Sequence, residues 1–258
     1  MHQTKIQELG SAIFHWLSFQ KLCGRGAMLS EAYLSQPIGE YLLHSASGRL
    51  YTEQSHPSLN GTRTDGRPRQ IDFCIRRPSD TDASPVLTTA FELKWIRDKR
   101  DIKSGIVDDI MRQEALRVSN KNYVDRYLIL AGETADFESF TSVQYNPGAA
   151  AKRQPFYSEL LELPVIHQRP GSLPMLSSHP SPAKSINVMT MPAAVLRYLN
   201  DFSQAYNSPL PTRFTTTLLT SIFNDRFTVC IWKISSVPKR QTIPVPPRRT
   251  RGTMPATP

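Results

Sequence analysis

The sequence predicts an α/β domain with a mixed central sheet flanked by helices. Residues 4–19 carry apolar side chains at helical spacing, and the runs at 69–77 and 86–96 are apolar with strand-like alternation. A further apolar run at 125–131 follows a helix of crossover length at about 102–119, so the last strand can pair in parallel with an earlier one.

The elements follow in the order helix, strand, strand, strand, helix, strand over residues 27–135. The first helix of this core covers about 29–44, with Ser30 as its cap and Pro37 predicted to kink or split it. The first strand covers about 49–56. Together these elements form the predicted αβββαβ core of the domain.

Segments outside that core are expected to elaborate the same domain. Residues 1–26 contain the N-terminal helix, which we interpret as an amphipathic helix packing on the core rather than a signal peptide. Residues 136–235 are expected to add C-terminal helices and one extra strand. The individual predictions are a helical stretch within 150–165, an exposed loop at 168–190, helices at 192–206 and 213–223, and a strand at 227–234.

Composition narrows the functional class. The formal net charge is +9, and residues 236–258 supply five of these positive charges with no acid, so we expect that Pro-rich tail to be disordered. This excess favours a polyanionic partner. No apolar run approaches the roughly 20 residues of a membrane helix, which argues against a membrane partner. Three sparse cysteines argue against disulfides and zinc, and are typical of a cytoplasmic protein.

Charged residues interrupt both central strands. Alternation places Glu92 and Lys94 on one face of their strand, and a hairpin centred near Asp82 places Asp72 opposite Glu92, with Cβ atoms about 5 Å apart. Two carboxylates at that distance repel unless a cation or proton lies between them, and Mg²⁺ binds one or two carboxylates together with water and phosphate oxygens. The alternative is a charge cluster on a solvated sheet face.

These residues resemble the PD-(D/E)XK, or restriction-endonuclease-like, nuclease superfamily. The match consists of Asp72, 19 intervening residues and then Glu92-Leu93-Lys94, within the family's order of elements; Ile71 stands where the family pattern has proline. The resemblance implies a Mg²⁺-dependent enzyme that hydrolyses phosphodiester bonds, with Mn²⁺ able to substitute and DNA as the expected substrate.

The resemblance also implies roles for individual residues. Asp72, Glu92 and the Leu93 carbonyl would hold the metal, and Lys94 would contact the attacking water or the phosphate. The family often adds an acid from the first core helix, and chain direction favours Glu31 over Glu40, with Glu53 as a further candidate. Predicted substrate-binding residues are Arg69, Arg76, Lys99, Arg100, Lys103 and, as an orienting residue, Gln113.

Two rival functions remain open at this stage. One is a nucleic-acid-binding module that keeps the fold without activity, and the other is an unrelated α/β protein-interaction domain. The sequence leaves open DNA or RNA, single or double strands, sequence specificity and biological role, and a homodimer is compatible with it.

Overall fold

The structure is a computed structural model. It describes residues 1–55, 59, 70–78, 85–97, 102–116, 124–141, 161, 175–177, 183–187, 210–211, 213–236 and 240–241. The predicted helices within 150–165 and at 192–206 lie outside these residues, apart from Leu161, which is buried.

An eight-stranded mixed sheet forms the centre of the molecule, which confirms the α/β class. Its order is β1-β2-β3-β4-β9-β8-β5, and β6 also pairs with β8. β3 and β4 are parallel, as the crossover helix predicts, and β9 joins β4 antiparallel. The strands are β1 (Arg49–Ser55), β2 (Gln70–Arg77), β3 (Val86–Ile96), β4 (Asp125–Glu133), β5 (Met175–Ser177), β6 (Lys184–Asn187), β8 (Arg213–Phe223) and β9 (Phe227–Ser236).

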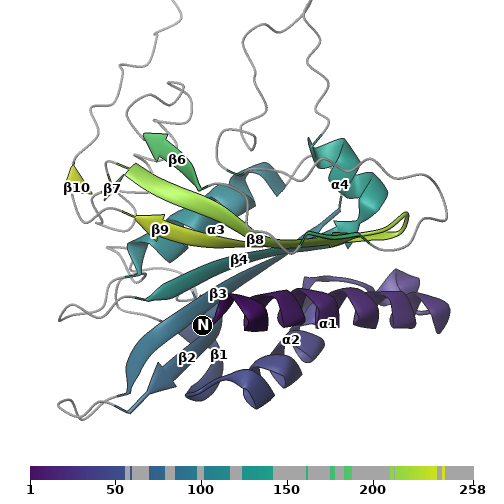
Figure 1. Ribbon diagram of the computed structural model, residues 1–258, viewed down its shortest axis with the longest axis horizontal. Helices are drawn as coiled ribbons and strands as arrows, with labels where there is room; N and C mark the ends of the chain where they lie inside the picture. The colour runs from purple at the N-terminus through teal and green to yellow at the C-terminus, as the bar shows by residue number, and fades with distance from the viewer. Residues whose placement is uncertain are drawn as a thin grey trace, which may run out of the picture.

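Helices cover both faces of this sheet (Figure 1). α1 (Gln3–Leu22) and α2 (Glu31–Ser45) lie on one face, and α3 (Ile102–Ala115) lies on the other (Figure 1). α4 (Thr134–Thr141) follows β4, and its Phe137 is buried with the α3 side. Side chains of β4 alternate between the two faces of the sheet: Leu128 packs on the α3 side and Ile129 on the α1/α2 side.

The helices α1 and α2 lie close to the ranges predicted from apolar spacing and from the Ser30 cap. Ile6, Leu9 and Ile13 of α1 are fully buried, and the helix packs on α2, β8 and β9. The Ser30 hydroxyl caps α2 by accepting the Tyr33 backbone N–H at 3.2 Å. α2 is continuous through Pro37, so the predicted split does not occur.

The prediction of a helix at 213–223 is wrong, because this segment is the long strand β8. It is rich in threonine, whose branched side chain suits a pleated surface. β8 forms a hairpin with β9, and the Asn224 side chain closes the turn by accepting the backbone N–H groups of Arg226 at 2.9 Å and Phe227 at 2.8 Å.

The prediction of a single extra strand is also wrong. β5 and β6 lie inside the segment 168–190, predicted to be an exposed loop, and both pair with β8. β10 (Arg240–Gln241), inside the tail predicted to be disordered, pairs with β7 (Leu210–Pro211). Short strands of two to four residues carry too little periodicity to be recognised without their partners.

The structure also describes the state of the cysteines and the hydropathy of the helices. Cys23, Cys74 and Cys230 are all free thiols. None of the described helices combines the length and hydropathy needed to cross a bilayer.

Candidate active site

The hairpin of β2 and β3 brings Asp72 to Glu92. Phe73 pairs with Phe91 and Ile75 with Thr89, and continuing this register by one residue sets Asp72 opposite Glu92. The predicted register is therefore confirmed over this stretch. The Asp72 carboxylate accepts the Leu93 backbone N–H at 2.7 Å, which fixes it against the strand that carries the Glu-Leu-Lys sequence.

Glu92 lies deep in the molecule, with 1% of its surface exposed. Its Oε2 accepts a hydrogen bond from the Arg112 guanidinium of α3 at 3.0 Å. Its other oxygen, Oε1, is buried and receives no donor hydrogen bond from the described residues, while the neighbouring Asp72 carboxyl lies close enough to share a proton with Glu92. A buried carboxylate oxygen without a partner is costly, so this atom is a natural position for a ligand.

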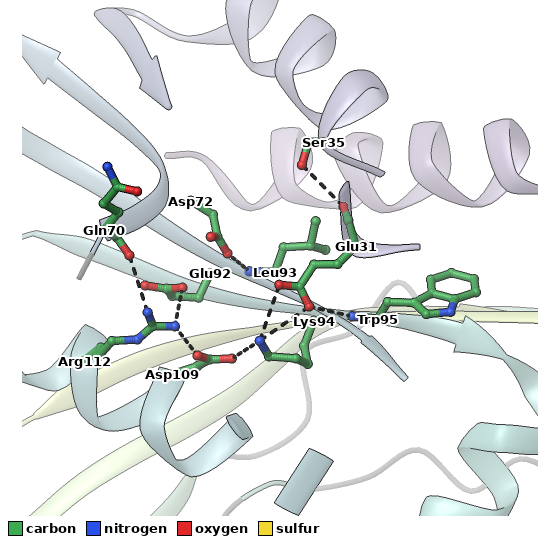
Figure 2. Close-up of polar contacts among 10 residues, drawn as sticks. All are labelled: Glu31, Ser35, Gln70, Asp72, Glu92, Leu93, Lys94, Trp95, Asp109 and Arg112. Atoms are coloured by element: carbon green, nitrogen blue, oxygen red, sulfur yellow. Dashed lines mark hydrogen bonds and ion pairs between the residues drawn. The ribbon is translucent and has the colours of Figure 1, made fainter. Parts of the chain in front are cut away.

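Lys94 lies between two carboxylates from different helices. Its Nζ is 3.4 Å from Glu31 at the start of α2 and 3.3 Å from Asp109 Oδ2 on α3. Glu31 also lies 3.4 Å from the backbone N–H of Trp95, which donates to it. Figure 2 shows these side chains converging from α2, β2, β3 and α3 on one patch.

Glu31, Asp72, Glu92 and Asp109 form what we call the acidic patch, and the pKa values of three of these acids are raised. Burial raises the pKa of Glu92 well above its usual range, and neighbouring Asp72 and Asp109 add to the rise, although Arg112 opposes it. Burial likewise raises the pKa of Glu31 and of Asp109. Burial therefore disfavours the ionised form of three acids in this patch.

The pKa of Lys94 is also raised, but by its neighbours and not by burial. Burial alone would lower the pKa of its ammonium, but the Asp109 and Glu31 carboxylates outweigh burial and raise it. Lys94 is consequently held as a cation.

The donor set fits a small hard cation. The described residues contain no group of three or more His, Cys, Asp and Glu side chains arranged to hold a metal ion. Two carboxylates, one with a free buried oxygen, nevertheless match the one or two that Mg²⁺ takes beside water and phosphate oxygens. Asp72 and Glu92 are the residues that would hold it.

The structure separates the three candidates for the extra acid. Glu31 is the one that contacts Lys94. Glu40 is exposed and accepts from Gln36 at 3.2 Å on the outer side of α2. Glu53 is exposed on the edge strand β1 with a φ of +48°, at the position that faces Asp72 in the β1–β2 register.

The predicted substrate-binding residues are less well placed. Arg76 stacks over the Tyr51 ring at 5.6 Å, four residues along β2 from Asp72. Gln113 is fully buried on α3, so it does not face solvent. Arg69, Lys99 and Arg100 lie outside the described residues, as does the side chain of Lys103.

Sequence reasoning missed Asp109 and Arg112. They stand three residues apart on α3, the spacing that places two side chains on one face of a helix, and they contact each other directly. Ile106 and Ile110 of the same helix are fully buried. The usable sequence signal is weak: Asp109 stands three residues after Ile106, a spacing that can share one helix face.

A cavity of about 330 Å³ lies elsewhere, at the opposite ends of β2 and β3. It is lined by Met1, His2, Lys5, Ser45, Ala46, Ser47, Ile75, Arg77, Thr88 and Thr89. No carboxylate lines it, and Lys5 and Arg77 bond the neutral oxygens of Ser45 and Ser47. The acidic patch, and not this cavity, carries groups suited to catalysis.

No protein-family model matches this chain, and comparisons with curated proteins and with solved structures give no significant match. The geometry of the acidic patch is therefore the main indication of function.

Proposed function

We propose that this protein is a metal-dependent nuclease of the PD-(D/E)XK type, which hydrolyses phosphodiester bonds in nucleic acid, with DNA as the expected substrate. Two features support the proposal. The elements α2, β1, β2, β3, α3 and β4 follow in the order of the restriction-endonuclease-like core. The three motif side chains come from adjacent strands and lie in one patch.

The charge imbalance of the patch carries the proposal. Among the described residues, four carboxylates meet two cations there, a surplus of acids that either protons or a bound cation must neutralise, since burial disfavours their ionised forms. An ion pair that serves only stability needs no such excess, since unpaired buried charge is costly. One divalent cation would balance it. The four acids are Glu31, Asp72, Glu92 and Asp109, and the two cations are Lys94 and Arg112.

Asp72 and Glu92 would hold Mg²⁺ or Mn²⁺, and the Leu93 carbonyl is a further predicted ligand. When bound, the ion supplies Lewis-acid activation of a water and neutralises negative charge that builds on the phosphate. The free Oε1 of Glu92 is the protein atom best prepared for it.

Lys94 would act as a fixed positive charge rather than as a base. Its Nζ lies between two carboxylates that favour the ammonium form, and 22% of its side chain is exposed. It can therefore reach a substrate phosphate while remaining charged. A preorganised cation aimed at developing negative charge is an effective catalytic group.

Substrate binding would rest on phosphate contacts, which give affinity without sequence choice. The net charge of +9 favours a nucleic-acid partner. The predicted phosphate-binding residues Arg69, Lys99 and Lys103, and a homodimer for cutting both strands, remain predictions.

Cleavage assays test the proposal. Wild type, Lys94→Ala and a control Lys233→Ala would be incubated with plasmid DNA, single-stranded DNA and RNA, each with Mg²⁺, Mn²⁺ or EDTA. Lys233 pairs with Asp125, at the opposite end of β4 from Glu133. We expect cleavage only with metal, a loss of about 100-fold or more in Lys94→Ala, and normal cleavage in the control.

Other outcomes would select the rivals. Nucleic-acid binding without metal-dependent cleavage would identify an inactive binding module. Absence of both binding and cleavage would favour a protein-interaction domain.

A further inference from the structure

Helix α3 directs two charged side chains at the motif residues of the sheet. Asp109 contacts Lys94, and Arg112 contacts Glu92, while Asp109 and Arg112 also contact each other. In Figure 2 the contacts form one continuous chain, from Glu92 through Arg112 and Asp109 to Lys94 and then Glu31.

We propose that Asp109 and Arg112 are positioning residues, through which α3 fixes the Glu92 carboxylate and the Lys94 ammonium in their working geometry. This inference rests on the proposed nuclease function and adds two residues that the PD-(D/E)XK pattern does not contain.

Arg112 determines which oxygen of Glu92 remains free. Its guanidinium donates to Glu92 Oε2 at 3.0 Å, to the Gln70 backbone carbonyl at 3.4 Å and to Asp109. A planar guanidinium with three acceptors has a defined orientation, unlike an ammonium. Because Oε2 is occupied, Glu92 is left with Oε1 for a metal ion.

Asp109 couples this arrangement to Lys94. Its side chain is 2% exposed, and its two oxygens face different cations, Oδ1 toward Arg112 and Oδ2 toward Lys94. Loss of its charge would release both cations together. Groups behind metal ligands commonly orient them, and their removal costs about 10- to 100-fold in metal affinity or activity.

The same helix offers a matched control. Glu114 is also 2% exposed and pairs with Arg126 of β4 at 3.2 Å, and Arg126 further donates to the Leu116 carbonyl at 2.9 Å. This pair ties the end of α3 to β4. Glu114→Gln and Asp109→Asn therefore each remove one buried negative charge of α3 that is paired with an arginine.

Three measurements on wild type, Asp109→Asn and Glu114→Gln test the proposal: thermal unfolding in EDTA, Mn²⁺ affinity by calorimetry without substrate, and kcat and KM for DNA cleavage. Thermal unfolding shows whether each variant still folds. Only Asp109→Asn should bind Mn²⁺ about 10- to 100-fold more weakly and lose kcat, with KM for DNA changed less than about threefold.

Equal Mn²⁺ affinity and equal kcat in the two variants would overturn the positioning role while leaving the nuclease proposal intact. A wild type that neither binds Mn²⁺ nor cleaves DNA would remove both proposals. If Asp109→Asn does not fold, Arg112→Lys replaces it, because it keeps the charge and loses only the planar donor geometry. Unchanged Mn²⁺ affinity in Arg112→Lys would equally overturn the proposal.

Discussion

Two ionic clusters of this molecule differ in how well they are neutralised. At the start of β4, one carboxylate, Asp125, receives both Lys233 at 2.7 Å and the N-terminal amine at 2.6 Å. In the acidic patch, two cations serve four carboxylates. Burial alone would raise the pKa of Asp125, but its hydrogen bonds outweigh burial and lower it, whereas the pKa of Glu92 is raised.

The two clusters have opposite effects on folding. A carboxylate with a lowered pKa is more stable ionised in the folded protein than in the unfolded chain, so Asp125 contributes to folding. A carboxylate with a raised pKa costs folding free energy when it ionises. Ionisation of the acidic patch therefore opposes folding, as the cation site that we propose there would require.

The largest expected effect comes from supplying that cation. We expect Mg²⁺ or Mn²⁺ to stabilise wild type by about 2.7 kcal/mol when the free ion is at 100 times its Kd, because the ion binds only the folded state. Thermal unfolding with and without EDTA measures the shift.

Asp72→Asn provides the contrast for this experiment. It removes one of the two carboxylate ligands, so the ion-dependent shift should disappear. A shift of full size in Asp72→Asn would show that the ion binds elsewhere.

A smaller effect should appear in the pH dependence of stability, with opposite signs for the two clusters. In EDTA, Glu92 contributes stability below its ordinary pKa of 4.5 and loses it as the pH rises through the raised value. Glu92→Gln keeps an acceptor for Arg112 and avoids ionisation, so its stability relative to wild type should increase from pH 4 toward neutrality.

Asp125→Asn should show the reverse trend. The stability from Asp125 is present above its ordinary pKa of 3.8 and is lost as the pH falls through the lowered value. The substitution should cost about 1 kcal/mol at neutral pH, given partial exposure, and less in acid. Urea unfolding across pH measures both variants, and parallel pH profiles would contradict the distinction between the clusters.

The smallest expected effect belongs to a surface pair. Lys21 and Glu133 are 3.2 Å apart with 41% and 47% of their side chains exposed. Lys21→Ala should change the free energy of unfolding by less than about 1 kcal/mol and leave cleavage unchanged. A larger loss, measured by urea unfolding, would mean that this pair anchors α1 to β4.

Local patterns predicted much of the central sheet. The bounds of β3 match the predicted strand, and those of β2 differ by one residue. The register that brings Asp72 to Glu92 follows from alternation and from matching the two apolar faces of one hairpin. Such short-range pairing needs no knowledge of the remaining chain.

Local patterns predicted the strands of the C-terminal half less well. β8 contains threonine and leucine in a pattern that also suits a helix, and its pairing with β9, β5 and β6 decided its conformation. β-structure depends on partners to a greater degree than helix does, so propensity alone is a weak guide.

The sequence by itself determined the motif hairpin and the charges that interrupt it, because strand alternation fixes which side chains share a face. Chain direction already favoured Glu31 over Glu40, and the structure agrees, but only the tertiary structure decided that Asp109 and Arg112 complete the patch. Adjacent Asp108 and Asp109 cannot be ranked in sequence. The packing of Ile106 and Ile110 against the sheet sets the rotation of α3, and that rotation turns Asp109 inward.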